Sequence, residues 1–376
     1  MLHTSDASSL WILMGSAIRM AQSQGLHRDG AVLGLPPFEI EMRRRLWWYI
    51  VTLDGRLTEL TGSETCLPES ADTLLPSNFN DGDIQSEMTT LPEERVGASE
   101  MTFCLLKYEV VRFLQEKDPR PDPHGIVHKG GERRSVSDLE GFLEKKFLRF
   151  CDPVIPVQFL TTTVARSAIC KIRQMLHHRR PRPNFDKGEP PPGKQEQTPQ
   201  SYRTLHIATQ NMKYDNLIHS SRSLRGFLWQ VNFDFSWGSA IFILRNLASH
   251  SSQWDKSMQA AWTQIEELYE HHPEFMDTDK VEHLIVGGLT LKAWSARETC
   301  LDSRGMRDGQ PPPTFITTLQ SMHVKFVSRN NYEGAGRVVD EESDFVELSG
   351  FDASTMADFD IDPIFSGVEW SEWGDH

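Results

Sequence analysis

The stretch PFEIEMRRRLWWYIVTLDGRLTELTG, residues 37–62, decides the fold class. Its apolar residues recur at three- and four-residue spacing, the period of one face of an α-helix. Glu39 and Glu41 each stand four residues before an arginine, the favourable order for ion pairs along a helix. The apolar stripe consists of Phe38, Met42, Leu46, Ile50, Leu53, Leu57 and Leu60. The stretch therefore predicts one long amphipathic helix that ends at Gly62.

This stripe also predicts which side chains the folded core holds. We expect Leu46→Ala, Trp47→Ala and Leu53→Ala each to destabilise the fold by about 2 to 5 kcal/mol, the usual range for buried large side chains. Arg44 is expected to be exposed, so Arg44→Ala should be almost silent. Asp54 lies near the stripe, where a buried carboxylate needs an arginine or a backbone donor. At Asp54 an ion pair is therefore favoured over a general base.

The same spacing predicts helices on both sides of this stretch. Before it, a helix is expected from about Ser9 to Gln24, with Gly25 ending it in a left-handed conformation. Its apolar face holds Leu10, Leu13, Met14, Ala17, Ile18 and Ala21. Further patterns occupy 139–150, opened by a capping box of Ser137 and Glu140, then 157–176, 255–269 and the stretch from Asp279 toward Cys300. No segment shows sustained two-residue alternation, so the prediction is an all-α fold.

Proline and charge divide the chain into regions. Residues 181–200 include three consecutive prolines, Pro190 to Pro192, and indicate a Pro-rich loop or linker. A second polar, charged loop runs from Lys117 to Arg134. The expected regions are a regulatory domain over 1–180, the linker over 181–200, a second helical block over 201–328 and an acidic aromatic tail over 329–376.

Net charge sets the tail apart from the rest. The formal net charge of −14 argues against general affinity for nucleic acid, because Lys and Arg drive phosphate binding. Residues 338–376 hold 12 acidic residues and no Lys or Arg, whereas residues 1–337 sum to only −2. The tail intersperses its acids with large apolar residues, among them Phe351, Phe359, Phe365, Trp370 and Trp373. This composition is typical of a disordered activation segment that folds on a coactivator, and a merely solubilising tail is the alternative.

Residue patterns for metal binding and catalysis are weak. The five cysteines, Cys66, Cys104, Cys151, Cys170 and Cys300, include no C-x-x-C pair, so we expect reduced, mostly buried thiols in an intracellular protein. His177–His178 and His271–His272 are expected to be solvated histidines at helix ends, because adjacent helical side chains point about 100° apart. We assign no catalytic, cofactor-binding or metal-binding residue, expect no enzyme activity, and find no membrane span.

The run Arg43–Arg44–Arg45, followed by Trp47–Trp48–Tyr49, combines positive charge with aromatic rings. Such a combination occurs on surfaces that bind nucleic acid. The helical stripe and the nearby Glu39 and Glu41 favour core packing instead.

Three motifs of the chain occur together: GSAIRMAQSQGLHRD at 15–29, PFEIEMRRRLWW at 37–48 and DGR at 54–56. As a set they resemble the fungal-specific transcription factor domain, the middle homology region of fungal binuclear zinc-cluster regulators. The matching residues are Gly25, His27, Arg28, Asp29, Arg43, Arg44, Arg45, Trp47, Trp48, Asp54 and Arg56. The resemblance implies an all-helical module that restrains or transmits activity in response to metabolites.

The family also places a six-cysteine zinc cluster, a linker and a dimerising coiled coil before this module. The sequence contains none of them, so the chain looks N-terminally truncated: it is either an incomplete gene product or a clusterless protein. Zinc and DNA contact are expected only through that cluster. The resemblance implies a nuclear regulator of metabolic genes whose tail contacts the transcription machinery, and leaves a homodimer and a small-molecule effector open. The alternative is a clusterless helical small-molecule-binding or adaptor protein.

Overall fold

The computed structural model describes residues 7–115, 126–127, 133–178, 199–231, 235–249, 254–276, 281–305 and 311–322. These residues are mostly helical, apart from loops and one antiparallel pair of two-residue strands, β1 (Ile126–Val127) and β2 (Arg133–Arg134). The predicted all-α class is confirmed. The acidic tail, residues 181–198 of the Pro-rich linker and most of the loop from Lys117 to Arg134 lie outside the described residues.

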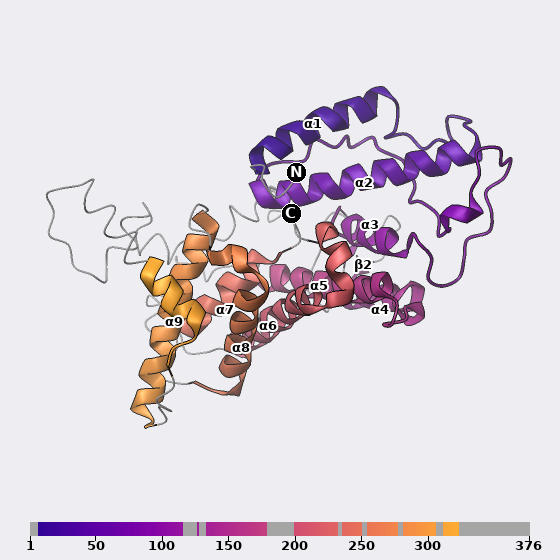
Figure 1. The fold of residues 1–376 in the computed structure, drawn as a ribbon. Coiled ribbons are helices and arrows are strands. Elements are labelled where there is room, and N and C mark those ends of the chain that lie inside the picture. The colour runs from indigo at the N-terminus through magenta and orange to yellow at the C-terminus, as the bar shows by residue number, and fades with distance from the viewer. Residues whose placement is uncertain are drawn as a thin grey trace, which may run out of the picture. The chain divides into compact units, whose positions relative to one another are not determined.

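The helices of Figure 1 and the short 3-10 segments between them have the following bounds. They are α1 (Ala7–Ser23), α2 (Pro37–Thr61), η1 (Asp81–Asp83), α3 (Thr102–Gln115), α4 (Val136–Lys146), η2 (Leu148–Phe150), α5 (Pro156–His178), α6 (Pro199–Ser220), η4 (Arg222–Gln230), α7 (Trp237–Ser249), α8 (Lys256–His271), η5 (Pro273–Met276) and α9 (Val281–Ser303), with a further helix over 314–322. No helix among the described residues is both long and apolar enough to cross a lipid bilayer.

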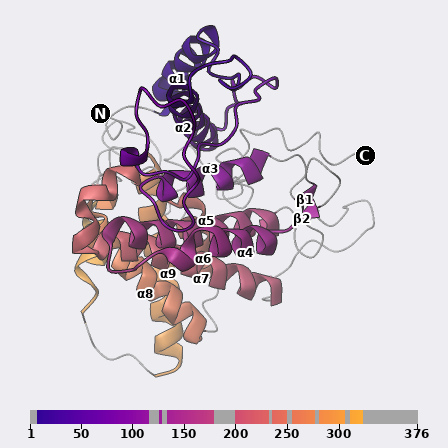
Figure 2. The ribbon, with the colours of Figure 1, turned by 90° about the vertical axis from the view of Figure 1, so that its right-hand side faces the viewer.

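The chain folds as two compact units. The first unit holds the described residues from 7 to 176 and from 223 to 231, and the second holds those from 177 to 222 and from 235 to 322. In the first unit α1 and α2 lie side by side (Figures 1 and 2). In the second, α7 packs against α9, and α6 packs against both α7 and α8.

Local signals set the helix ends. Pro37 occupies the first turn of α2, where its missing N–H is no loss, and Gly62 ends the helix at φ +64° with its N–H bonded to the Thr58 carbonyl. The predicted capping box of α4 is wrong by two residues. Ser135, in extended conformation, accepts the N–H of Asp138, and the Asp138 carboxylate accepts the N–H of Ser135. Ser137 already lies inside the helix because α4 begins at Val136.

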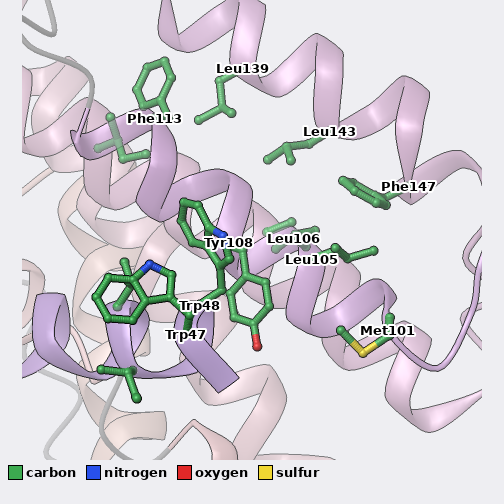
Figure 3. Close-up of a cluster of buried hydrophobic side chains, with 14 of the residues drawn as sticks. Trp47, Trp48, Met101, Leu105, Leu106, Tyr108, Phe113, Leu139, Leu143 and Phe147 are labelled. Carbon is green, nitrogen blue, oxygen red and sulfur yellow. The ribbon is translucent and has the colours of Figure 1, made fainter. Parts of the chain in front are cut away.

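The core of the first unit joins α2 to α3, α4 and α5. Figure 3 shows Trp47 and Trp48 of α2 beside the apolar face of α3, with the α4 side chains near the same cluster. The rings of Trp48 and Tyr108 have centroids 6.1 Å apart. The side chains of Leu106, Phe113, Leu139 and Phe147 are wholly buried. Burial of one such side chain contributes roughly 1.5 to 3 kcal/mol.

The buried face of α2 is rotated from the predicted stripe, although two residues of that stripe, Ile50 and Leu57, are buried as predicted. Met42 and Leu46, which the stripe places in the core, are 42% and 48% exposed. The buried stripe instead runs through Ile40, Arg44, Trp47, Val51, Asp54 and Thr58. Its spacing is equally helical, but it includes charged residues that a search for apolar positions passes over. Leu13 of α1, also predicted to be buried, is exposed for the same kind of reason: its helix turns another face to α2.

This rotation predicts different stabilities for two neighbours on α2. Trp47→Ala removes a side chain that is 2% exposed and should lower the free energy of unfolding by about 3 to 5 kcal/mol. Leu46→Ala, against the stripe prediction, should change it by only about 0.5 kcal/mol. Urea denaturation followed by circular dichroism measures both. Equal losses in the two variants would contradict the observed orientation of α2.

Candidate functional site

The motif loop begins at the end of α1. Gly25 has φ +69°, and its N–H bonds to the Gln22 carbonyl while the N–H of Leu26 bonds to the Ala21 carbonyl. These two bonds form a Schellman motif, as the glycine predicted. At Gly30 an added Cβ would lie 3.2 Å from the Cα of Ile40, so the loop returns closely against α2. The loop residues from Gly25 to Gly30 are thereby held beside the arginines of that helix.

Asp29 is the centre of a buried ionic network. Its carboxylate accepts two hydrogen bonds from Arg44, at 2.8 Å from Nε and 2.9 Å from Nη2. It also accepts the backbone N–H groups of Ala31 and Leu74, each at 3.0 Å. Four donors therefore saturate a carboxylate whose side chain is 3% exposed.

A second layer ties the segment around Asp72 to the motif loop. The Asp72 carboxylate accepts the backbone N–H of Asp29 at 2.8 Å and the Nε of Arg28 at 2.9 Å. The N–H of Asp72 donates to the carbonyl of His27, and the hydroxyl of Thr73 donates to the carbonyl of Leu26. Asp72 and Thr73 were not predicted, because 43 or more residues separate them from their partners and no local pattern marks them.

Each arginine of the run at 43–45 has a protein partner. Arg43 donates to the carbonyl of Gln24 at 2.6 Å. Arg45 pairs with Glu41 at 3.0 Å, the predicted spacing along the helix, and with Asp81 at 2.7 Å. These pairings support the interpretation that the arginine run packs within the protein rather than forming a basic surface for nucleic acid. The prediction that Arg44 is exposed is wrong, because its guanidinium neutralises the buried Asp29.

The remaining motif residues line the same helix. Trp47 is buried with its ring centroid 6.2 Å from that of His27. The indole N–H of Trp48 donates to the carbonyl of Leu74 at 2.9 Å. Arg56 pairs with Glu59. The motif thus joins the end of α1, helix α2 and the segment around residues 72–74 into one assembly.

Asp54 differs from Asp29 in its partners. It is 1% exposed and accepts the hydroxyl of Thr65 and the backbone N–H of Cys66. Among the described residues no arginine pairs with it, so the predicted ion pair is wrong. The predicted backbone donor is present.

Burial acts on both carboxylates, with opposite net results. Burial raises the pKa of Asp29, but hydrogen bonds from Arg44, Leu74 and Ala31 outweigh it and leave the pKa below its ordinary value. At Asp54 burial dominates the hydrogen bonds from Thr65 and Cys66, and the pKa is raised. The difference follows from the guanidinium, which only Asp29 has.

The described cysteines form no disulfide with one another. Cys300 is buried but Cys66 is exposed, so the prediction of mostly buried thiols is wrong there. Burial raises the pKa of the Cys104 thiol, and it raises the pKa of Cys170 to about 11. Both side chains are therefore held in the neutral thiol form by their buried surroundings.

The second unit holds a group that the sequence did not predict. His272 is 4% exposed, so its expected solvation at a helix end is wrong: the chain turns inward after α8. Its Nε2 lies 2.8 Å from Asp215 and its Nδ1 lies 2.8 Å from Glu274. Burial lowers the pKa of His272, but the two carboxylates outweigh it and raise the pKa to about 9. The side chains of His177 and His178 and the tail residues Phe351, Phe359, Phe365, Trp370 and Trp373 lie outside the described set.

The residues of this assembly belong to a segment that matches a known protein family. Residues 1–115, which contain the whole ionic network, match the model of the fungal specific transcription factor domain. The chain therefore carries this domain, as its motifs predicted. No solved structure matches the chain.

Curated relatives extend the similarity beyond the domain. The chain is 32% identical over 312 residues to the aurofusarin cluster transcription factor aurR2 of Gibberella zeae, covering 81% of this chain and 45% of that protein. It is 28% identical over 392 residues to the pyriculol/pyriculariol biosynthesis cluster transcription factor 1 of Pyricularia oryzae, covering 96% of this chain and 50% of the relative. The transcriptional regulator AacuB of Aspergillus aculeatus is 26% identical over 365 residues. The chain spans about half the length of these relatives.

The network predicts that Arg44 is essential for stability although it is charged. Arg44→Ala leaves the Asp29 carboxylate buried without its cation and should lower the free energy of unfolding by about 3 to 5 kcal/mol. Arg28→Ala removes an ion pair whose side chains are 46% and 41% exposed, and should change it by about 0 to 1 kcal/mol. Urea denaturation of both variants checks the contrast. A silent Arg44→Ala would contradict the ionic network.

The pKa shifts of Asp29 and Asp54 predict contributions to folding stability that change with pH in opposite directions. The lowered pKa of Asp29 adds stability above its unfolded value of about 4, and this stability is lost as the pH falls through the folded pKa. The raised pKa of Asp54 adds stability at low pH that is lost as the pH rises through the folded pKa.

Asp29→Asn should therefore destabilise at neutral pH, with a deficit that shrinks as the pH falls below about 4. Asp54→Asn should leave the free energy of unfolding unchanged or raise it at pH 7. In acid, the stability of this variant relative to the wild type should fall. The measurement is the urea midpoint of the three proteins between about pH 7 and pH 3. Parallel curves for the two variants would show that the two carboxyl environments are equivalent, against the structure.

Proposed function

We propose that this chain is the regulatory region of a fungal transcription factor that controls metabolic genes. The observation that carries the proposal is the match of residues 1–115 to the fungal specific transcription factor domain. The curated relatives, which are named as transcription factors and regulators, support the same role. The proposed role is not catalytic, and Asp29 fits it, because four hydrogen-bond donors saturate this carboxylate and leave it no lone pair for a reacting group.

The names of the relatives suggest a class of target. Two of them are transcription factors of clusters named for aurofusarin and for pyriculol and pyriculariol biosynthesis. We infer that the chain regulates genes of a biosynthetic cluster and acts in the nucleus. In this proposal DNA is bound through a zinc cluster of the kind found in the family, which the sequence does not contain. The effector of the regulatory domain is a small molecule.

The proposed contact with the transcription machinery is the acidic tail. Residues 338–376 combine 12 acidic residues with Phe351, Phe359, Phe365, Trp370 and Trp373. Apolar side chains supply the buried contact with a coactivator groove, and the acids steer the approach to a basic surface. The helical units then regulate, and the tail activates.

Deletion of the gene in the fungus that carries it tests this function. Transcripts of a neighbouring biosynthetic cluster should fall, and re-expression of the wild-type protein should restore them. The triple variant Phe359→Ala, Trp370→Ala, Trp373→Ala should restore less than a tenth of the wild-type level, because it removes the apolar anchors and keeps every acid. Quantitative RNA sequencing is the measurement.

A matched triple variant, Ser349→Ala, Ser354→Ala, Ser366→Ala, changes the same tail without touching its aromatic residues and should restore transcription fully. Unchanged transcripts in the deletion strain would contradict a role in transcription and favour the adaptor alternative. Full restoration by the aromatic variant would instead contradict only the role of the tail. A fusion of residues 338–376 to an unrelated DNA-binding domain, read with a reporter gene, tests the tail separately.

A further inference from the structure

Asp215, His219 and His272 converge inside the second unit. Asp215 and His219 stand four residues apart on α6, so their side chains lie on one face of that helix. His272 follows directly after α8, which packs against α6. The three side chains are 13%, 10% and 5% exposed. Potential ligands from two helices thus meet in a nearly closed site.

Their donor atoms lie close to one another. Nε2 of His272 lies 2.8 Å from Oδ2 of Asp215. Nδ1 of His219 lies 3.5 Å from the same oxygen, and it donates its proton to the backbone carbonyl of Asp215 at 3.0 Å, which leaves the lone pair of His219 on Nε2. The two imidazole rings have centroids 4.1 Å apart. One ligand atom from each of the three residues lies within 4.8 Å of the others. Tetrahedral zinc, with bonds of 2.0 to 2.2 Å, holds its ligands about 3.3 Å apart, so the three ligand atoms must draw closer together and the His219 ring must present Nε2 to the ion.

A fourth residue orients the site. Oε1 of Glu274 lies 2.8 Å from Nδ1 of His272. Without a metal, the ring of His272 donates from Nδ1 to Glu274 and from Nε2 to Asp215. A metal that binds Nε2 takes the place of the proton there, which is released, while Nδ1 keeps its proton and its bond to Glu274. Histidines that bind metals commonly have a carboxylate on the other ring nitrogen in this way. Glu274 therefore supplies the supporting contact of a metal site.

Aromatic rings pack against His272. The ring of Phe235 is 5.4 Å from that of His272, and the ring of Phe275 is 5.7 Å from it. Trp237 packs against both of these phenylalanines. An apolar wall keeps water from competing for the ligands and strengthens the attraction between a cation and the carboxylates.

We propose that Asp215, His219 and His272 bind one zinc-class divalent ion, with Glu274 positioning His272. Two imidazoles and one carboxylate suit Zn²⁺, whereas Ca²⁺ and Mg²⁺ prefer oxygen ligands alone. The three protein ligands leave a fourth position for water. Because the ligands come from α6 and from the turn after α8, the ion links these two helices and stabilises the second unit by binding only its folded form. This site is independent of the regulatory role proposed above.

Metal titration of the purified chain of residues 1–376 tests the proposal. Cys66 is an exposed free cysteine, and thiolates are good zinc ligands, so every sample carries Cys66→Ser to remove this background. After treatment with a chelator and its removal, isothermal titration with Zn²⁺ should show one tight site, and Co²⁺ should give the strong visible absorption of a tetrahedral complex. Zn²⁺ should also raise the melting temperature.

Variants distinguish the metal ligands from the positioning residue and from background binding. Asp215→Asn and His219→Gln should each weaken binding at least about 100-fold and abolish the cobalt spectrum, and Glu274→Gln should weaken it about 10- to 100-fold. His271→Gln, the matched control at the neighbouring histidine, should bind like the parent protein. Far-UV circular dichroism confirms that each variant is folded.

Two results would overturn the proposal. One is a folded parent protein that binds no Zn²⁺, which would leave the group a structural ion pair between His272 and its two carboxylates. The other is unchanged Zn²⁺ binding by Asp215→Asn and His219→Gln variants that are folded, which would place the ion at another site.

Discussion

The buried ion pair of Asp29 and Arg44 is the constraint on which the first unit depends. A carboxylate withdrawn from water is strongly destabilising unless its oxygens are fully bonded, and here a guanidinium and two backbone N–H groups meet that requirement. These donors come from the motif loop, from α2 and from residue 74. All three segments must therefore be in place before the charge can be buried, which makes their association cooperative.

The ion pair also explains where sequence reasoning succeeded and failed. The bounds of α2 were predicted to within one residue because Gly62 and the helical period are local signals. The predicted buried face is correct at Ile50 and Leu57 but misses Arg44, because the partner of Arg44 stands 15 residues away, beyond any periodic pattern. Helix α3 was overlooked although Leu106, Val110 and Phe113 have helical spacing. Helix α6 gives a weaker signal, because its apolar residues show little preference for one face.

Resemblance identified the motif residues, but only the fold identified their partners. Asp72 and Leu74 complete the network from a loop without a recognisable motif. The group in the second unit was hidden for the same reason, because 57 residues separate Asp215 from His272. The adjacent pair His271–His272 drew attention to neighbours in sequence, while the informative spacing was the four-residue step from Asp215 to His219.

The family match ends at residue 115, but the core does not. Leu106 and Phe113 at the end of the matched segment belong to one cluster with Leu139, Leu143 and Ile169 of α4 and α5. Without those helices the apolar face of α3 would be open to water, at about 25 cal/mol for each Å² exposed. The folding unit that carries the motif network therefore extends to residue 176. The similarity to aurR2 agrees with this larger unit, because it covers 81% of the chain and so continues beyond the matched domain.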